Sequence, residues 1–388
     1  GIRLLVNRGD EESDITDYGV PGQYSATFKP SWYTIAQPFS LFYTAASQAC
    51  QMIEQIPSVE FKNQEQKNAY LGEAYFWRGW AHWFLLVNFR NIPLEKKFPG
   101  TTKDYKPQST PEEAWDFIIE DFKMAKKLLP KKGYWKGDNL GRVTAGSAAG
   151  MLGLSYLYRS GIEPKYGTST TTYYNEAAEN FNEIIRGDYG TYKLMPNYDD
   201  NFKVATENND ESVLEFQFLG DVINTGFNPG LVTSGCWRDT RGTQPPTLIS
   251  ENSQVVHQWV YDAFVASKDV NGYTDPRMFG TLIFDDKSAD INAKPGNEVK
   301  LFDNKTFTEY YVKKDKAGNT LKGFSAVSPR AGNYKAACRK GMDWTLPGKN
   351  PGNNFWYGNI RANGMNYTFL RYADILLMYA EAVLKGGT

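Results

Sequence analysis

Apolar residues in the first half of the chain recur at alternating steps of three and four positions, which is the spacing of one face of an α-helix. Within residues 64–88, for example, Tyr70, Ala74, Trp77 and Ala81 form one such stripe. This spacing predicts that helices dominate the first half of the chain. The same periodicity predicts helices over residues 37–56, 64–88, 111–129, 144–159 and 173–186.

Local signals mark several ends of these helices. Thr110 and Glu113 are spaced as a capping box, with a proline at the first helical position between them. In the fourth helix, Gly150 and Gly153 predict a smooth surface that another element can approach closely. Gly161 is interpreted as the C-terminal cap of that helix.

The helices repeat in pairs. Ala74 and Ala149 are the small-residue centres of two successive pairs, separated by about twice the 34-residue period of tetratricopeptide repeats. Stacked pairs bury a continuous core, and long insertions between pairs are where binding residues tend to lie. The pattern predicts a mainly α fold: a tetratricopeptide-like helix-pair scaffold with a loop-rich ligand face that carries small strands.

Strands and loops replace most of the helices in the second half. Residues 212–218 alternate between the two faces of a strand, and residues 298–325 look like short strands around a turn. The stretches 220–250 and 341–365 are rich in loop-forming residues. Function is expected among these loops.

Two further helices interrupt this half. One is predicted over residues 251–267, with Trp259 and Ala263 on its inward face, and another over 368–385 closes the chain. The chain is accordingly divided into two parts of one integrated fold, a helical-repeat half with an N-terminal ligand loop and a loop-rich half, residues 1–210 and 211–388.

Composition narrows the classes of function. The net charge is −1, whereas a domain that neutralises phosphates is normally basic, so nucleic acid is not expected as a partner. Three cysteines without CxxC spacing argue against a disulfide framework and a cysteine-based zinc site. No apolar run is long enough to span a membrane as a helix. The unusual feature is the aromatic content, which reaches 15%.

Catalytic patterns are missing from the sequence. The two histidines, His82 and His257, lie far apart on apolar stretches, and no HExxH, GxSxG or phosphate-binding glycine loop occurs. Asp269, Asn271 and Asp275 do not have the spacing of an EF-hand calcium loop. We therefore expect no catalytic residues, no bound metal and no cofactor.

Four charged residues lie within apolar helical patterns. Glu73 and Arg78 are surrounded by alanine and aromatic residues, and Arg371 and Asp374 are three positions apart in the closing helix. Residues at that spacing share a helical face and can pair. We expect all four to form ion pairs that hold helices together rather than to act in catalysis.

Aromatic residues in polar loops remain as candidates for binding. Aromatic faces in loops rich in asparagine and glycine suit stacking against flat C–H faces such as sugar rings, with amides supplying hydrogen bonds. Together they favour binding over catalysis. The candidate ligand-binding residues are Tyr24, Trp32, Trp237, Trp344 and Trp356.

Several stretches together resemble the SusD/RagB family. Residues 68–80 (NAYLGEAYFWRGW) resemble an early helix of these proteins, although Gly79 stands where the family usually has alanine. Residues 173–202 resemble a second family unit, and residues 275–277 (DPR) a third. The most specific match is FLRYADILLMYAEA at residues 369–382, which is close to the family's RYAD helix.

This resemblance implies a surface lipoprotein of the outer membrane that captures glycans. It further implies delivery of oligo- or polysaccharide to a TonB-dependent transporter of the SusC type. Peptide binding, associated with the RagB branch, is one alternative, and a Trp-rich helical toroid glycosidase or a protein-binding tetratricopeptide scaffold are others. Because the chain opens at Gly1 without an initiator methionine, we expect the lipid-anchored cysteine to lie outside this fragment.

Overall fold

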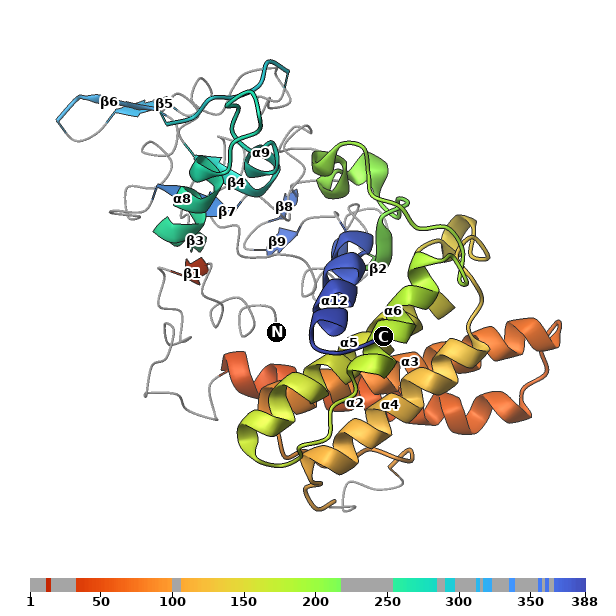
Figure 1. Ribbon diagram of the computed structural model, residues 1–388. Helices are drawn as coiled ribbons and strands as arrows, with labels where there is room; N and C mark the ends of the chain where they lie inside the picture. The colour runs from red at the N-terminus through yellow and green to blue at the C-terminus, as the bar shows by residue number, and fades with distance from the viewer. Residues whose placement is uncertain are drawn as a thin grey trace. The chain divides into compact units, whose positions relative to one another are not determined.

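The chain forms two compact units, each assembled from separate stretches of sequence, in the computed structural model (Figure 1). The helical unit comprises residues 36–194, 210–215 and 368–388, and the sheet unit comprises the remaining residues. The structure describes residues 12–14, 33–99, 106–217, 254–284, 290–296, 312–314, 317–322, 335–338, 355–357, 360–362 and 366–388.

Long helices build the helical unit, packed in the order in which they occur along the chain. Each of α3, α4, α5 and α6 packs against the next, and α12 closes the row against α6. This arrangement confirms the predicted mainly α, helix-pair fold. The helices are α2 (Tyr33–Gln55), α3 (Gln64–Phe89), α4 (Pro111–Leu128), α5 (Ala145–Tyr166), α6 (Tyr174–Ile185) and α12 (Tyr372–Leu384).

Side-chain caps begin α4 and α5 at the positions that the sequence indicates. The Thr110 side chain accepts a hydrogen bond from the Glu113 N–H, and the Glu113 carboxylate accepts one from the Thr110 N–H at 2.9 Å. Thr144 and Ser147 form the equivalent box at the start of α5. Such caps satisfy N–H groups that have no partner inside the helix.

Helix α5 is longer than predicted, because Gly161 does not end it. The helix continues to Tyr166 and ends at Gly167, whose φ of 67° is the left-handed conformation favoured by glycine. Pro164 lies inside this last turn and lacks the N–H that would reach the Ser160 carbonyl. The Tyr174 hydroxyl donates to that carbonyl instead, at 3.4 Å.

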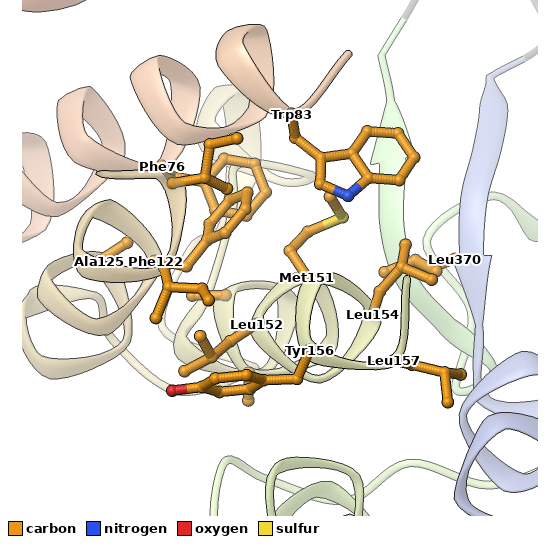
Figure 2. Packing of buried hydrophobic residues seen from close by; sticks show 14 of the residues in the cluster. Phe76, Trp83, Phe122, Ala125, Met151, Leu152, Leu154, Tyr156, Leu157 and Leu370 are labelled. Atoms are coloured by element: carbon orange, nitrogen blue, oxygen red, sulfur yellow. The ribbon is translucent and has the colours of Figure 1, made fainter. Parts of the chain in front are cut away.

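The core of the helical unit surrounds α5, which is buried on nearly every side (Figure 2). The Phe76 and Phe122 rings of α3 and α4 meet edge to face, with centroids 5.6 Å apart, beside Leu152 of α5. On the α6 side, a methyl group at Gly153 would lie 2.6 Å from the Phe181 ring. The predicted close approach at Gly153 is therefore present, and only glycine permits it.

The closing helix is shorter than the sequence pattern predicts. Residues 367–371 form a strand, β10 (Tyr367–Arg371), which pairs with β2 (Ser212–Phe216), and α12 begins after it. Arg371 is thus the N-cap of α12 rather than a residue within it. Its backbone N–H donates to Asp374 at 2.8 Å, while its guanidinium donates mainly to Glu211, at 2.7 Å. The side chains of Arg371 and Asp374 are 3.7 Å apart.

The two charged residues of α3 that the sequence singles out are also ion-paired. Arg78 of α3 donates two hydrogen bonds to Asp121 of α4, at 2.7 and 2.9 Å, and both side chains are buried. Burial by itself would lower the pKa of Arg78, but the hydrogen bonds and charge of Asp121 raise it above its ordinary value. Glu73 pairs with Arg142, a residue of the segment before α5 whose guanidinium carbon lies over both the Tyr70 and Trp135 rings, 4.5 and 4.7 Å from their centres.

His82 fixes the segment after α3 to that helix. Its Nε2 accepts a hydrogen bond from the Glu95 N–H at 2.9 Å, so the ring proton is on Nδ1, which donates to the Arg78 carbonyl. The imidazole is fully buried, and burial lowers its pKa from 6.5 to about 4. The folded protein therefore contains His82 in its neutral form.

Among the described residues, the sheet unit contains short strands and two short helices. Four strands form one sheet in the order β1, β3, β7, β4, in which Glu12 pairs with Val256, Val255 with Ala337, and Leu282 with Cys338. The elements are β1 (Glu12–Asp14), β3 (Gln254–Val256), α8 (Gln258–Ala266), α9 (Arg277–Thr281), β4 (Leu282–Phe284) and β7 (Ala336–Cys338).

Two antiparallel hairpins and several short 3₁₀ turns complete the described elements. The predicted strands around residue 318 are confirmed, with Gly318 at a φ of 86° in the turn. No described helix combines the length and apolarity needed to cross a bilayer. The hairpins are β5 (Val312–Lys314) with β6 (Thr320–Lys322) and β8 (Phe355–Tyr357) with β9 (Ile360–Ala362); the 3₁₀ turns are η1 (Ile56–Ser58), η2 (Gly137–Asn139), η3 (Tyr198–Phe202) and η4 (Val204–Thr206).

We predict that Arg371→Ala destabilises the helical unit by about 3 kcal/mol, because it leaves the buried Glu211 carboxylate without its cation. Urea unfolding followed by circular dichroism measures this loss. The matched control is Lys123→Ala, which breaks an exposed pair with Glu120 and should change stability by less than about 0.5 kcal/mol. An Arg371→Ala protein with unchanged stability would show that the pair does not hold the fold.

We also predict that acid destabilises the protein through His82. The unfolded chain binds a proton on this side chain below pH 6.5, whereas the folded protein resists protonation until about pH 4. The contribution of His82 to the free energy of unfolding is therefore complete above pH 6.5. It falls by about 2 to 3 kcal/mol between pH 6.5 and pH 4.5. His82→Gln, which does not titrate, should lose correspondingly less stability between pH 7.5 and pH 4.5. Equal losses in both proteins would contradict this assignment.

Candidate functional site

The predicted ligand-binding aromatics fall almost entirely outside the described residues. Tyr24, Trp32, Trp237 and Trp344 lie there, and their convergence on one face remains a prediction. Trp356 belongs to β8, where its backbone is opposite Arg361 of β9.

An exposed tryptophan on α8 was missed by the sequence pattern. Trp259 was expected to face the interior together with Ala263, but its exposed fraction is 54% and Ala263 is also exposed. The helix is also shorter than predicted, because residues 254–256 form β3 and α8 starts only at Gln258. The side of this helix that enters the core is instead marked by Tyr261, which is 4% exposed.

The buried side of α8 packs into the core of the sheet unit. Tyr261 contacts a small apolar core, and Val260, Phe264 and Val265 pack against it. Figure 1 shows α8 beside β3 and β7 in this unit. Trp259 is therefore displayed outward by a helix whose other side is anchored. The buried members of this core are Val256, Tyr261, Met278, Phe279, Leu282, Phe284 and Ala336.

Small and polar residues surround Trp259 on its helix. Asp262 and Ala263 follow it by three and four positions, so they lie on the same face of the helix, and both are exposed. Asp262 accepts a hydrogen bond from the Gln258 side-chain amide at 2.7 Å. A carboxylate and an amide are thereby held next to an exposed aromatic ring.

The loop that follows α8 is ordered by its own polar side chains. The Asp269 carboxylate accepts hydrogen bonds from the N–H groups of Asn271 and Tyr273, at 2.8 and 3.0 Å. Lys268 donates to the Thr274 hydroxyl at 2.9 Å. Asp269 thus shapes a turn, and among the described residues no group of three or more His, Cys, Asp or Glu side chains is arranged to hold a metal ion.

The DPR segment ends this loop. The Asp275 carboxylate accepts hydrogen bonds from both the backbone and the guanidinium of Arg277, and these bonds lower its pKa below the ordinary value. The Asp275 N–H in turn donates to the Ser267 carbonyl at 3.0 Å, which joins the two ends of the loop. The segment therefore fixes the loop between α8 and α9.

The arrangement on α8 suits binding of a neutral, flat ligand. An exposed indole offers a stacking face, and the neighbouring carboxylate and amide can exchange hydrogen bonds with hydroxyl groups. The ion-paired residues of the helical unit differ from this set. Glu73, Arg78 and Arg371 each form an ion pair with another residue of the helical unit.

Two family models match the chain. Residues 11–157 match a model described as starch-binding and associating with the outer membrane, and residues 163–388 match the model of the SusD family. The DPR segment and the RYAD helix both lie in the second match. That model covers more than half of the chain.

Individual relatives agree with these matches. A SusD-like protein of Bacteroides ovatus is 26% identical over 260 residues, covering 61% of this chain, and the chain spans less than half of that protein. A SusD-like carbohydrate-binding protein of Bacteroides fragilis has a TM-score of 0.69 at 14% identity, covering 98% of this chain and 68% of that one. A laminarin-binding SusD-like protein has a TM-score of 0.59 at 19% identity, covering 100% and 76%.

At these identities the solved structures establish a shared fold. The family models add sequence features to it, from the first helices to the closing helix. On both grounds, the chain belongs to the SusD family.

Proposed function

We propose that this protein binds glycans at its surface and acts as a binding protein rather than an enzyme. The observation that carries the proposal is the exposed Trp259 on the anchored helix α8, beside the hydrogen-bonded Asp262 and Gln258. Sugar rings present C–H faces to an indole and hydroxyl groups to a carboxylate or amide. The site therefore has both kinds of contact that a saccharide needs.

The relatives support this choice of ligand. One solved protein of the same fold is named as carbohydrate-binding and another as laminarin-binding. The loop aromatics Tyr24, Trp32, Trp237, Trp344 and Trp356 are proposed as further contacts of the same kind. The experiments below also test the two alternative functions, RagB-type peptide binding and glycoside hydrolysis.

We further propose that the bound glycan is passed to a SusC-like TonB-dependent transporter, and that the protein is a surface lipoprotein of the outer membrane. Support comes from the family model whose description names association with the outer membrane. The codons upstream of Gly1 provide a direct check. A lipoprotein signal with its cysteine is expected, and a gene product that fractionates with the cytoplasm would contradict the proposal.

We predict that Trp259→Ala weakens glycan binding about tenfold or more, since stacking on an aromatic ring contributes about 1–3 kcal/mol. Affinity gels containing laminarin, xyloglucan or starch measure the retardation of the purified protein. Trp259→Phe keeps an aromatic face and should retain most of the affinity. Unchanged retardation of Trp259→Ala, with binding lost instead in Trp32→Ala, Trp237→Ala or Trp344→Ala, would move the site to the loops.

We predict that none of these glycans is cleaved, because the sequence carries no recognisable catalytic constellation. Product analysis by mass spectrometry after long incubation tests this expectation. The appearance of shorter oligosaccharides would favour the glycosidase alternative. Retention of a peptide library without any glycan retardation would favour the peptide alternative.

A further inference from the structure

The end of α5 displays a second exposed aromatic side chain, far from α8 in the sequence. Tyr166 is 67% exposed, and the guanidinium carbon of Arg90 lies 4.1 Å from the centre of its ring. The cation covers one face of the ring. The high exposure leaves the opposite face to solvent.

Arg90 is itself held rigidly. It donates two hydrogen bonds to the Glu163 carboxylate, at 2.7 and 2.8 Å, and a third to the Thr168 hydroxyl at 3.1 Å. Glu163 is 1% exposed and also accepts a hydrogen bond from the Trp115 indole at 2.7 Å. A buried carboxylate therefore positions the cation, and the cation positions the ring of Tyr166.

The backbone at Arg90 is unusual in the same place. Its φ of 67° and ψ of −84° lie where residues with a side chain are rarely found. Such conformations persist only where the surroundings enforce them, and they cluster at functional sites. From this backbone position the Arg90 side chain reaches the Glu163 carboxylate, which fixes its guanidinium.

Exposed polar residues flank Tyr166 in the sequence, with Lys165 before it and a hydroxyl-rich segment after Gly167. The segment after α5 reads Thr-Ser-Thr-Thr-Thr over residues 168–172, and Thr170, Thr171 and Thr172 are exposed. Among the described residues, the Nε–H of Arg90 makes no hydrogen bond. Because Glu163 neutralises Arg90, the cation that covers one face of the ring adds no net charge to the site.

We propose that the open face of Tyr166 is a second saccharide-binding site, in the helical unit, where a neutral pyranose ring stacks on the tyrosine. The Arg90 guanidinium, anchored by Glu163 on the covered face, holds the ring in place for the sugar. This inference rests on the proposed glycan binding and adds a contact point that is independent of α8. An anionic ligand is disfavoured because the guanidinium already carries a bidentate carboxylate.

Hydroxyl-radical footprinting of the whole protein tests this site directly. Laminarin, xyloglucan and starch are the probes, and oxidation is mapped by mass spectrometry with and without each one. We expect at least about a threefold drop in oxidation at Tyr166 with a probe that the protein binds, as stacking removes one ring face from solvent. Tyr134, which is 36% exposed without a stacked cation, is the internal control and should not change.

The outcomes separate the two proposals. Protection of Trp259 without protection of Tyr166 overturns the second site and leaves the proposed function standing. Protection of neither residue, with no retardation in affinity gels, overturns both. Protection of Tyr166 in wild type and in the Trp259→Ala variant supports the second site.

A variant series separates binding from a purely structural role of the Arg90–Tyr166 contact. In the Trp259→Ala background, Tyr166→Ala should reduce the remaining affinity at least about threefold, whereas Tyr166→Phe and Tyr134→Ala should keep it. A folded Tyr166→Ala protein whose affinity matches that of Tyr134→Ala would show that the contact only stabilises the end of α5.

Discussion

The helical unit depends on the close packing of other elements around α5. Gly146, Gly150 and Gly153 lie along this helix, where added methyl groups would meet Tyr192, the Leu370 and Ile375 side chains, and Phe181 in turn. Small residues on a buried helix let side chains of neighbouring elements contact its backbone closely. In an interior packed this densely, a shift of one element displaces the elements around it. The positions of α6, β10 and α12 are therefore set by the surface of α5.

Arginines paired with buried carboxylates restrict the orientation of these packed elements. Arg78 with Asp121, Arg90 with Glu163 and Arg371 with Glu211 each join two elements that are distant in the sequence. Apolar contacts alone tolerate small rotations of one helix on another, whereas a guanidinium facing a buried carboxylate accepts only a narrow range of geometries. Breaking one partner leaves an uncompensated charge, which is why such pairs define a single arrangement.

Both proposed binding residues use the same principle of an exposed ring on a fixed support. Trp259 is presented by a helix whose other side is buried around Tyr261, and Tyr166 by a cation fixed to a buried carboxylate. Holding the ring in place before the ligand arrives reduces the entropy lost on binding. Rigid helices and anchored loops are thus well suited to recognition of sugars by stacking.

The sequence by itself determined the helical architecture, the capping box at Thr110, the close approach at Gly153 and the family, because these depend on local spacing and short motifs. Only the tertiary structure decided that α5 continues past Gly161 and that Arg371 pairs chiefly with Glu211. It also decided that Trp259 faces solvent and Arg90 supports Tyr166. The Arg90 and Arg371 pairs depend on partners 73 and 160 positions away, and the exposure of Trp259 depends on which side of α8 the core of the sheet unit covers. Periodicity cannot encode either, since it records which residues share a face and not what that face meets.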